Sequence, residues 1–529
     1  MGGRVGVWAG ADRANTMSGP QEDALIAPKP VVSKEDVAKG AGLAAVARLG
    51  ALIEVVAQPA YTWMFGLAGY GVYVVLWAAI NILANVLDIA FGQALQRIIP
   101  TTKDRAEEHG VVRFALLVST GLGALAALAI TLTAPWLASF VAADPKDAAI
   151  LPRAIAIFAW SLPLWIFVET ATAAARAKRA FGPEIRLRIF WEQVARLVFA
   201  AGFFVGGFGV EGLLLGHLAS LAMTAWLAWK LLARYYDPAL LLRAPLPPAL
   251  RRQVLTTGLA MLPPALARRA YNDLPPILLN AMLPGSQGAV AAGLYGIARK
   301  IASIPLIVRQ SFLYVLAPLA SEQGAANRAG IAPLYAFSTH ISMLLAVPLA
   351  ALLILIAPDM LSAFAPGSSE ALSVLIALLV ARAAEAAFGP ATPIIEMIGH
   401  KGLPLANSLF GLVLWLGLGL WLVPLYGAYG MALAVSAAVV ATALLAVAEL
   451  AISDRLSPFT SGFWKSALAA GLFVAALWLA GDVLNAFDQP VRALTLLVLF
   501  WPMLWIALRL GLEPCDKAAL GKLAAKLRL

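Results

Sequence analysis

The chain has 529 residues, of which 61% are hydrophobic and 13% are charged. A soluble domain contains about 25% charged residues, so this composition excludes a water-soluble globular protein and an intrinsically disordered one. The hydrophobic residues fall in runs of roughly 20, the length with which an α-helix crosses about 30 Å of hydrocarbon. The sequence therefore predicts an all-α polytopic membrane protein.

Net charge and cysteine content narrow the expected partners. The formal net charge of +10, with 39 Lys and Arg residues, would suggest nucleic acid in a soluble protein. Here the basic residues sort by membrane side, so we expect no nucleic acid partner. The single cysteine, Cys515, cannot form an internal disulfide, and the four histidines show no paired spacing. We expect no metal site and no cofactor.

Hydrophobic runs in chain order predict about fourteen transmembrane helices. The fifth run is flanked by charges and the seventh is interrupted by prolines, which makes them the weakest. The runs begin near Ala41, Tyr70, Val112, Ala148, Ile189, Gly212, Thr256, Ala291, Leu334, Ala371, Leu403, Gly430, Ser466 and Val491. An even number places both termini on the same side of the membrane.

The loops between these runs indicate the orientation, because cytoplasmic loops are enriched in Lys and Arg. If the N-terminus is inside, every alternate loop is basic, and the opposite loops contain only Lys146, Arg153 and Arg492. We therefore expect both termini in the cytoplasm.

A polar, proline-rich connection at residues 237–253 divides the chain into two halves. The turn Phe208–Gly212 in the first half recurs as Tyr426–Gly430 in the second, which suggests two six-helix bundles related by a pseudo-twofold axis along the membrane normal. The predicted parts are a polar cytoplasmic tail (1–38), an N-terminal six-helix bundle (39–236), a cytoplasmic linker (237–253), a C-terminal six-helix bundle (254–456), two additional transmembrane helices (457–512) and a basic amphipathic tail (513–529).

The basic tail has a leucine face opposite a cationic face. Its leucines and its Lys and Arg residues are Leu520, Leu523, Leu527, Lys517, Lys522, Lys526 and Arg528. This pattern suits a helix that lies on an anionic inner leaflet, and an ordinary solvated tail is an equal alternative.

Polar residues follow helical spacing inside several predicted spans. In the second span they are Asn81, Asn85, Asp88, Gly92 and Gln96, and in the tenth they are Arg382, Glu385, Gly389, Thr392 and Glu396. Each set predicts one continuous helix face. Such faces line a wet cavity or, alternatively, neutralise charge within one helix, as the pair of Arg382 and Glu385 could.

Several basic residues in predicted spans have no obvious carboxylate on their own helix. Among Arg48, Arg268, Arg299 and Lys300 none has such a partner, whereas Asp273 can pair with Arg269 four residues earlier. Unpaired cations in a cleft between bundles could bind an anionic head group, because phosphate offsets their desolvation. The predicted substrate-binding residues are Arg48, Arg268, Arg269, Arg299, Lys300 and Arg382.

Carboxylates in the same spans are candidates for coupling transport to Na⁺ or H⁺. They are Glu54, Asp88, Glu169, Asp273 and Glu385. A structural pairing role is an equal alternative for each. No loop on the outer side is long enough for a catalytic domain, and no Walker-type glycine loop is present, so we do not expect an enzyme.

Two segments resemble a known family. The run from Gly69 to Ala78 and the segment from Ala94 to Pro100 resemble the first helical hairpin of oligosaccharide (O-antigen and exopolysaccharide) flippases in the multidrug/oligosaccharidyl-lipid/polysaccharide exporter superfamily. The aromatic-Gly-x-x-Gly turns Phe208–Gly212 and Tyr426–Gly430 are similar to theirs. The resemblance covers residues 39–456. Fourteen spans match lipid II flippases rather than most O-antigen flippases, but the arginine-rich opening of lipid II flippases is absent.

This resemblance implies a flippase that moves a polyprenyl-diphosphate-linked oligosaccharide across a bacterial inner membrane by alternating access, for lipopolysaccharide or other surface polysaccharide. It also implies membrane lipids as partners, and we expect a monomer. The alternatives are a cation-coupled multidrug antiporter of the same fold, a lipid II flippase, and a membrane glycan polymerase or ligase. The last of these would need an outer catalytic loop.

Overall fold

The computed structural model describes residues 51–178, 186–308, 328–398 and 402–528. Within these ranges the chain forms helices and turns and contains no β-strand, which confirms the predicted all-α class. Helices satisfy their own backbone hydrogen bonds, which a chain in hydrocarbon must do because no water is available there.

The helices of the first half are separated by short turns. They are α2 (Ala51–Leu87), α3 (Phe91–Ile98), α4 (Arg105–Ala138), α5 (Pro145–Ala148), α6 (Leu151–Phe158), α7 (Ser161–Ala177), a π-helical segment (Arg186–Trp191), α9 (Glu192–Val205), α10 (Val210–Tyr235) and α11 (Pro238–Arg243).

The second half continues in the same way. Its helices are α12 (Pro248–Met282), α13 (Ser286–Ala302), α15 (Arg328–Leu355), α16 (Ala357–Ser362), α17 (Ala371–Ala387), α18 (Ala391–Ile398), α19 (Leu403–Ser453), α20 (Ser461–Leu484), α21 (Gln489–Gly511), α22 (Pro514–Ala519) and α23 (Lys522–Leu527).

Eight helical segments among the described residues are long and apolar enough to cross a membrane. Two of them contain a non-helical glycine at positive φ, Gly66 in α2 (φ 74°) and Gly427 in α19 (φ 56°). Glycine adopts this conformation without a Cβ penalty, so each long segment reverses direction as two helices. The chain is therefore a multi-pass membrane protein, and Gly427 lies in the turn that the sequence predicted between the eleventh and twelfth spans.

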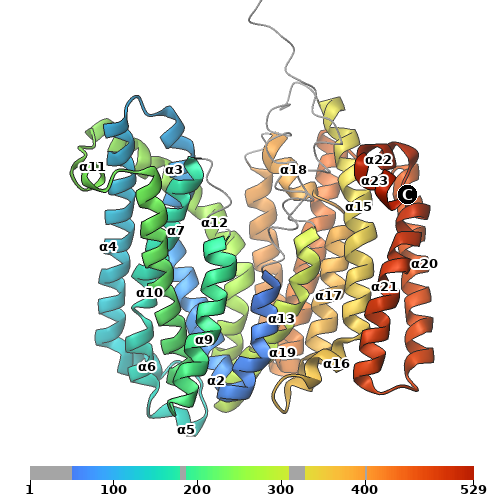
Figure 1. The fold of residues 1–529 in the computed structure, drawn as a ribbon, viewed down its shortest axis with the longest axis horizontal. Helices are drawn as coiled ribbons and strands as arrows, with labels where there is room; N and C mark the ends of the chain where they lie inside the picture. The colour runs from blue at the N-terminus through green and yellow to red at the C-terminus, as the bar shows by residue number, and fades with distance from the viewer. Residues whose placement is uncertain (1–50, 179–185, 309–327, 399–401, 529) are drawn as a thin grey trace, which may run out of the picture.

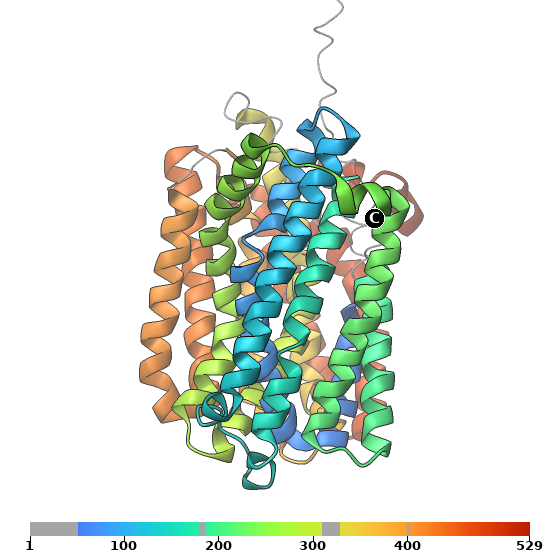
Figure 2. The same ribbon diagram turned by 90° about the vertical axis from the view of Figure 1, so that its left-hand side faces the viewer.

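The helices pack in groups that follow the two halves of the chain (Figure 1). In the first group α4, α6, α7, α9 and α10 pack together, and in the second α12, α13, α15, α17 and α19 do so. Helix α2 contacts both groups, and α20 and α21 pack on α15 at the edge of the second. In Figure 2 the first group faces the viewer and its helices run from one end of the molecule to the other.

The two ends of the molecule differ in charge. The connection from α3 to α4, helix α11, and helices α22 and α23 lie at one end, whereas α5 and α16 lie at the other (Figure 1). We call the first the basic end, because it contains the Lys and Arg residues of these segments, and the second the opposite end.

The predicted linker is partly helical and packs on the first group. It includes α11 and the start of α12, and the Arg113 Nη1 of α4 donates a hydrogen bond to the Ala244 carbonyl at 3.2 Å. A Cβ at Gly110 would lie 2.3 Å from the Pro245 carbonyl oxygen. The connection between the halves therefore rests directly on the backbone of α4.

Candidate functional site

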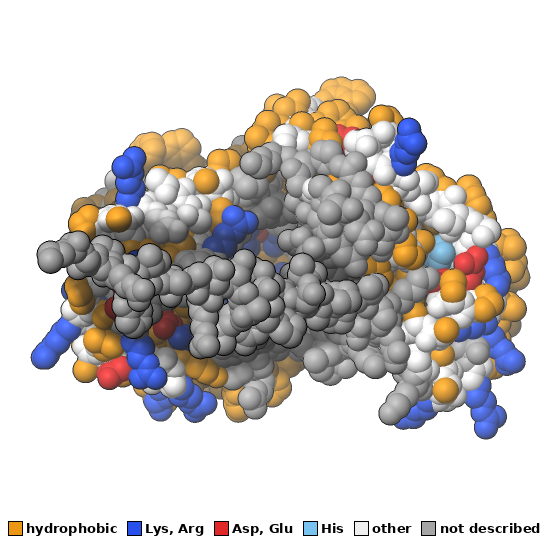
Figure 3. Space-filling model, turned by 90° about the horizontal axis from the view of Figure 1, so that it is seen from above, with side chains coloured by type: hydrophobic (Ala, Val, Ile, Leu, Met, Phe, Trp, Pro, Cys, Tyr) orange, Lys and Arg blue, Asp and Glu red, His pale blue; other side chains and the backbone are white. Residues whose placement is uncertain are grey.

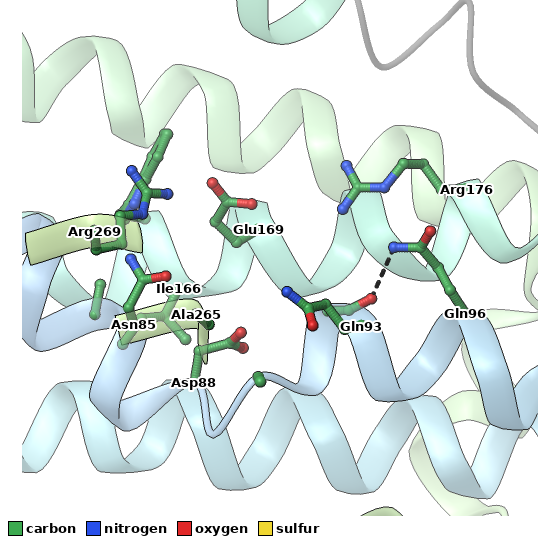
Figure 4. A pocket seen from close by; sticks show the side chains of 13 residues that line it. Asn85, Asp88, Gln93, Gln96, Ile166, Glu169, Arg176, Ala265 and Arg269 are labelled. Atoms are coloured by element: carbon green, nitrogen blue, oxygen red, sulfur yellow. Dashed lines mark hydrogen bonds between the residues drawn. The ribbon is translucent and has the colours of Figure 1, made fainter. Parts of the chain in front are cut away.

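A polar chamber of about 190 Å³ lies between α3, α7 and α12, next to the end of α2 (Figure 4). A water molecule occupies about 30 Å³ of liquid, so the chamber can contain several waters or part of a head group. Its lining combines two carboxylates, two guanidiniums and three amides, namely Asp88, Glu169, Arg176, Arg269, Asn85, Gln93 and Gln96. Seen from the basic end, the surface between the two groups is hollowed and shows Lys or Arg side chains within the hollow (Figure 3).

The chamber lies where the predicted second span is interrupted. Helix α2 ends at Leu87 and α3 begins at Phe91, and between them Ile89 and Ala90 have φ values of 50° and 51°. The left-handed conformation costs about 1–2 kcal/mol for a residue with a Cβ, so surrounding packing must impose it. The prediction of one continuous helix face from Asn81 to Gln96 was therefore wrong. Nevertheless, Asn85, Asp88, Gly92 and Gln96 all line the chamber from both sides of the break.

Asp88 and Glu169 are bound by side chains of neighbouring helices. The Thr170 hydroxyl donates a hydrogen bond to Asp88 Oδ1 at 3.0 Å. Glu169 accepts two hydrogen bonds from the Arg188 guanidinium, at 2.6 and 3.2 Å. A bidentate contact of this kind fixes the orientation of both groups. Both carboxylates therefore face the chamber and already accept hydrogen bonds from neighbouring side chains.

Arg269 brings a cation into the chamber from the second half of the chain. It lies on α12 and, in Figure 4, it is next to Glu169 of α7. Its Nη1 is 3.8 Å from Asp273 Oδ2, the pairing that the sequence predicted. The chamber is therefore lined by charged groups from both halves.

Arg299 and Lys300 line a second, smaller pocket between α2 and α13. Lys300 forms an ion pair with Glu54 of α2, and Arg299 forms one with Asp273 of α12 at 3.2 Å and donates to the Asn272 carbonyl. The prediction that both cations are unpaired was wrong, because their partners come from neighbouring helices. The pocket has a volume of about 20 Å³, room for about one water.

Of the remaining predicted binding residues, one forms an ion pair on its own helix, and the side chains of the other two lie outside the described residues. Arg382 Nη1 lies 2.9 Å from Glu385 Oε2 within α17, the pairing alternative of the sequence analysis. Helix α17 ends at Ala387, and Gly389 has a φ of 73°, so the predicted continuous face from Arg382 to Glu396 was wrong. Arg48 and the side chain of Arg268 lie outside the described residues.

The structure therefore distributes the described candidates rather than placing them in one cavity. Asp88, Glu169 and Arg269 line the chamber, and Glu54, Arg299 and Lys300 line the small pocket. Asp273, only 4% exposed, connects the two, because it pairs with both Arg269 and Arg299.

Two arginines that contribute to the chamber were not among the predicted binding residues, one in its lining and one bound to a carboxylate of the lining. Arg176 lines the chamber, and Arg188 binds Glu169 while its guanidinium lies 4.8 Å from the Trp165 ring centroid. The signal was present for Arg176, which follows Glu169 by two helical turns and therefore shares its face.

Toward the opposite end, the two halves meet through backbone contacts. A Cβ at Gly71 of α2 would lie 1.8 Å from the Ala289 carbonyl oxygen of α13, and one at Gly293 would lie 2.8 Å from the Leu67 carbonyl oxygen. Beside them the Asn280 amide accepts from the Ala142 N–H at 2.9 Å and donates to the Ala142 carbonyl at 2.8 Å. We call these contacts the glycine seam. Glycine and backbone leave no room for water there.

Comparisons with known proteins agree with this architecture. Residues 37–323 match the family model described as polysaccharide biosynthesis protein. No curated protein matches the chain. Similar solved structures include the lipid II flippase MurJ in an inward closed conformation, with a TM-score of 0.68 and 11% identity over 88% of this chain and 99% of that one.

Two further similar structures are transporters. One is a MATE protein in complex with MaL6, with a TM-score of 0.60 and 16% identity over 79% of this chain and 95% of that one. The other is a MOP superfamily transporter from Pyrococcus furiosus with a binding pocket of reverse polarity, with a TM-score of 0.59, 16% identity and the same coverage. At these identities the likeness concerns the fold.

Proposed function

This chain belongs to the polysaccharide biosynthesis protein family, whose model matches more than half of its length, and from this premise we propose that it is a flippase for a polyprenyl-diphosphate-linked oligosaccharide. The cargo would cross a bacterial inner membrane, from the cytoplasmic to the outer leaflet, for lipopolysaccharide or another surface polysaccharide. The positive-inside rule supports a cytoplasmic basic end with both termini on that side.

The observation that carries the proposal is the polar chamber among membrane-spanning helices. Charged groups are costly in hydrocarbon and usually mark a substrate or ion path. Here amides from α2 and α3 can hydrogen-bond sugar hydroxyls, and Arg176 and Arg269 can contact the diphosphate, since guanidinium binds phosphate bidentately. A purely apolar cargo would need neither group.

The unequal ends of the molecule support transport by alternating access. The chamber lies near the basic end, and the glycine seam lies toward the opposite end. Cargo would enter the chamber from the basic end and leave after the seam separates and the chamber closes. Opening the seam would break the Asn280 hydrogen bonds and the contact of α2 with α13, so cargo or ion binding has to offset that cost.

The test is a flipping assay in proteoliposomes with a labelled polyprenyl-diphosphate glycan. Arg269→Ala and Arg176→Ala should each lower the rate by about tenfold or more, because each removes a charge-assisted hydrogen bond to the cargo. Arg269→Lys should retain part of the rate. Arg243→Ala is the matched control, because this exposed cation lies at the same end but outside the chamber. Unchanged flipping in the Arg176 and Arg269 double variant would refute the assignment of the chamber.

A second candidate is a cation-coupled antiporter of the same fold, favoured by the two chamber carboxylates, Asp88 and Glu169. The same proteoliposomes distinguish it when they are loaded with an organic cation and given a Na⁺ or H⁺ gradient. Gradient-driven efflux of the cation, together with no flipping of the lipid-linked glycan, would replace the first candidate. Repeating the flipping assay with lipid II as the cargo tests the alternative that the protein is a lipid II flippase.

A further inference from the structure

Helices α20, α21 and α22 together carry a cluster of three cations at the basic end, which is separate from the chamber. Lys465 lies near the start of α20, Arg509 in the last turn of α21, and Lys517 in α22. The right-hand side of Figure 3, where these helices lie, shows Lys and Arg side chains beside a histidine and acidic side chains. Nothing in the transport cycle proposed above uses these cations.

The cations meet around one helix end. Lys517 Nζ donates to the Arg509 carbonyl at 2.7 Å, and Lys465 Nζ donates to the Leu512 carbonyl at 3.4 Å. These carbonyls belong to the last turn of α21 and to the residue that follows the helix. Both ammonium groups are therefore at the last turn of α21. Partial burial, followed by the positive charges of Lys465 and Arg509, lowers the pKa of Lys517, as expected for a cation with other cations nearby.

The nearby carboxylates are engaged elsewhere. Asp516 Oδ2 lies 2.8 Å from His340 Nδ1 in α15, and Glu513 Oε1 accepts from the Ser461 hydroxyl at 3.2 Å. Within the part of the chain that the structure describes, neither Lys465, Arg509 nor Lys517 has a carboxylate within ion-pair distance. Among the described residues, the cluster thus has three cations, two of which donate to carbonyl oxygens, and none of the three forms an ion pair with a carboxylate.

The surroundings match the head-group layer of a membrane. The Arg509 guanidinium lies 5.3 Å from the Trp505 ring centroid, and Trp464, in the first turn of α20, is 64% exposed. Tryptophan is enriched at the membrane–water interface, and basic pockets on the cytoplasmic side bind anionic head groups. The Trp505 Nε1 donates to the Leu527 carbonyl at 2.6 Å, which ties α23 beside the cluster.

We propose that Lys465, Arg509 and Lys517 form a binding site for the phosphate of an anionic glycerophospholipid in the leaflet at the basic end. A phosphodiester can form the ion pairs that these three cations do not form with the described carboxylates, and the acyl chains of the lipid can extend along the exposed apolar faces of α20 and α21. Because Asp516 and Lys517 are adjacent on α22, the bound lipid would also stabilise the contact that joins α22 to His340 of α15. This site does not depend on the identity of the transported cargo.

The experiment titrates the full-length protein in zwitterionic detergent micelles with phosphatidylglycerol and counts bound lipid by native mass spectrometry. Lys517→Ala, Lys465→Ala and Arg509→Ala should each weaken binding about fivefold, as expected for each basic residue near an anionic lipid. Lys517→Arg, which preserves the charge, should bind as the unmodified protein does. Lys230→Ala is the matched control, because Lys230 is also a cation beside a tryptophan, 3.6 Å from the Trp226 ring centroid, but stands outside the cluster. It should change binding less than twofold.

Three results would overturn the proposal. Equal losses in the Lys517 and Lys230 variants would indicate diffuse attraction rather than a site. Full binding in the triple alanine variant would place the lipid elsewhere. Complete competition by inorganic phosphate at equal concentration would assign the cluster to a soluble anion. Thermal unfolding with phosphatidylcholine alone checks that each variant is folded. When phosphatidylglycerol is added, Lys517→Arg and Lys230→Ala should gain as much stability as the unmodified protein, and the single alanine variants of the cluster should gain less.

Discussion

The chamber near the basic end and the glycine seam toward the opposite end both join the two halves of the chain, but through different chemical groups. The chamber uses long charged side chains that can change partners, whereas the seam uses glycines and carbonyl groups that pack without any side chain between them. A polar cavity needs groups that can exchange water for cargo, and a tight closure needs backbones in contact. In the proposed transport cycle, the cargo would contact the basic end and the opposite end would close.

The largest change in stability is expected when a charged group that connects the chamber and the small pocket is removed. Asp273→Ala should lower the free energy of unfolding by about 3 kcal/mol or more, because removing one partner of a buried ion pair leaves uncompensated charge, here on Arg269 and Arg299. Chemical unfolding in detergent measures it. Asp482→Ala, at an exposed site, should change stability by less than about 0.5 kcal/mol. Equal effects of the two variants would mean that Asp273 does not organise the two pockets.

The seam is tested by adding one methyl group. Gly71→Ala should destabilise the closed seam by about 1–3 kcal/mol, the usual cost of overpacking, because the new Cβ would overlap the Ala289 carbonyl. Flipping should fall accordingly. Gly121→Ala is the control, since no atom lies within 4 Å of a Cβ there, and an Ala in a helix is favoured over Gly by about 0.5–1 kcal/mol. If the Gly71 variant behaved like the Gly121 variant, the seam would not be a tight closure.

A smaller effect is expected from the amide beside the seam. Asn280→Ala removes two hydrogen bonds to Ala142, worth about 2 kcal/mol together, and should shift the population toward an open seam. Opening of the seam can be measured with a Val74→Cys variant that also carries Cys515→Ser. An open seam should make this cysteine react faster with a membrane-impermeant maleimide added from the opposite end. Asn485→Ala, at an exposed turn, should leave the labelling rate unchanged. Slower labelling in the Asn280 variant would contradict a role in closure.

The smallest effect should come from the pair on α17. Arg382→Ala breaks an ion pair between neighbours on one helix, worth about 0.5 kcal/mol, and Arg382 lines neither pocket. Flipping should change by less than about twofold, against the tenfold loss expected for Arg269→Ala. A loss comparable to that of the Arg269 variant would instead restore Arg382 to the substrate path.

The pattern of charges along the chain predicted only part of the site. The spacing of Arg269 and Asp273 was sufficient to predict their pairing, because residues four apart on a helix are neighbours. The partners of Lys300 and Arg299 could not be found in this way, since Glu54 and Asp273 lie on other helices. The break at Ile89 and Ala90 was equally hidden, because neither residue type favours the left-handed conformation, and only packing imposes it.

The sequence by itself determined the membrane setting, the all-α class and the family, because hydrophobic run length and local motifs are properties of contiguous residues. It also located the turn at Gly427, where the residue type indicates the conformation. Only the tertiary structure decided which charges share a pocket, which neutralise each other, and where glycines bring two backbones into contact. Those outcomes depend on distances between helices far apart in the chain, and residue spacing along one helix contains no information about them.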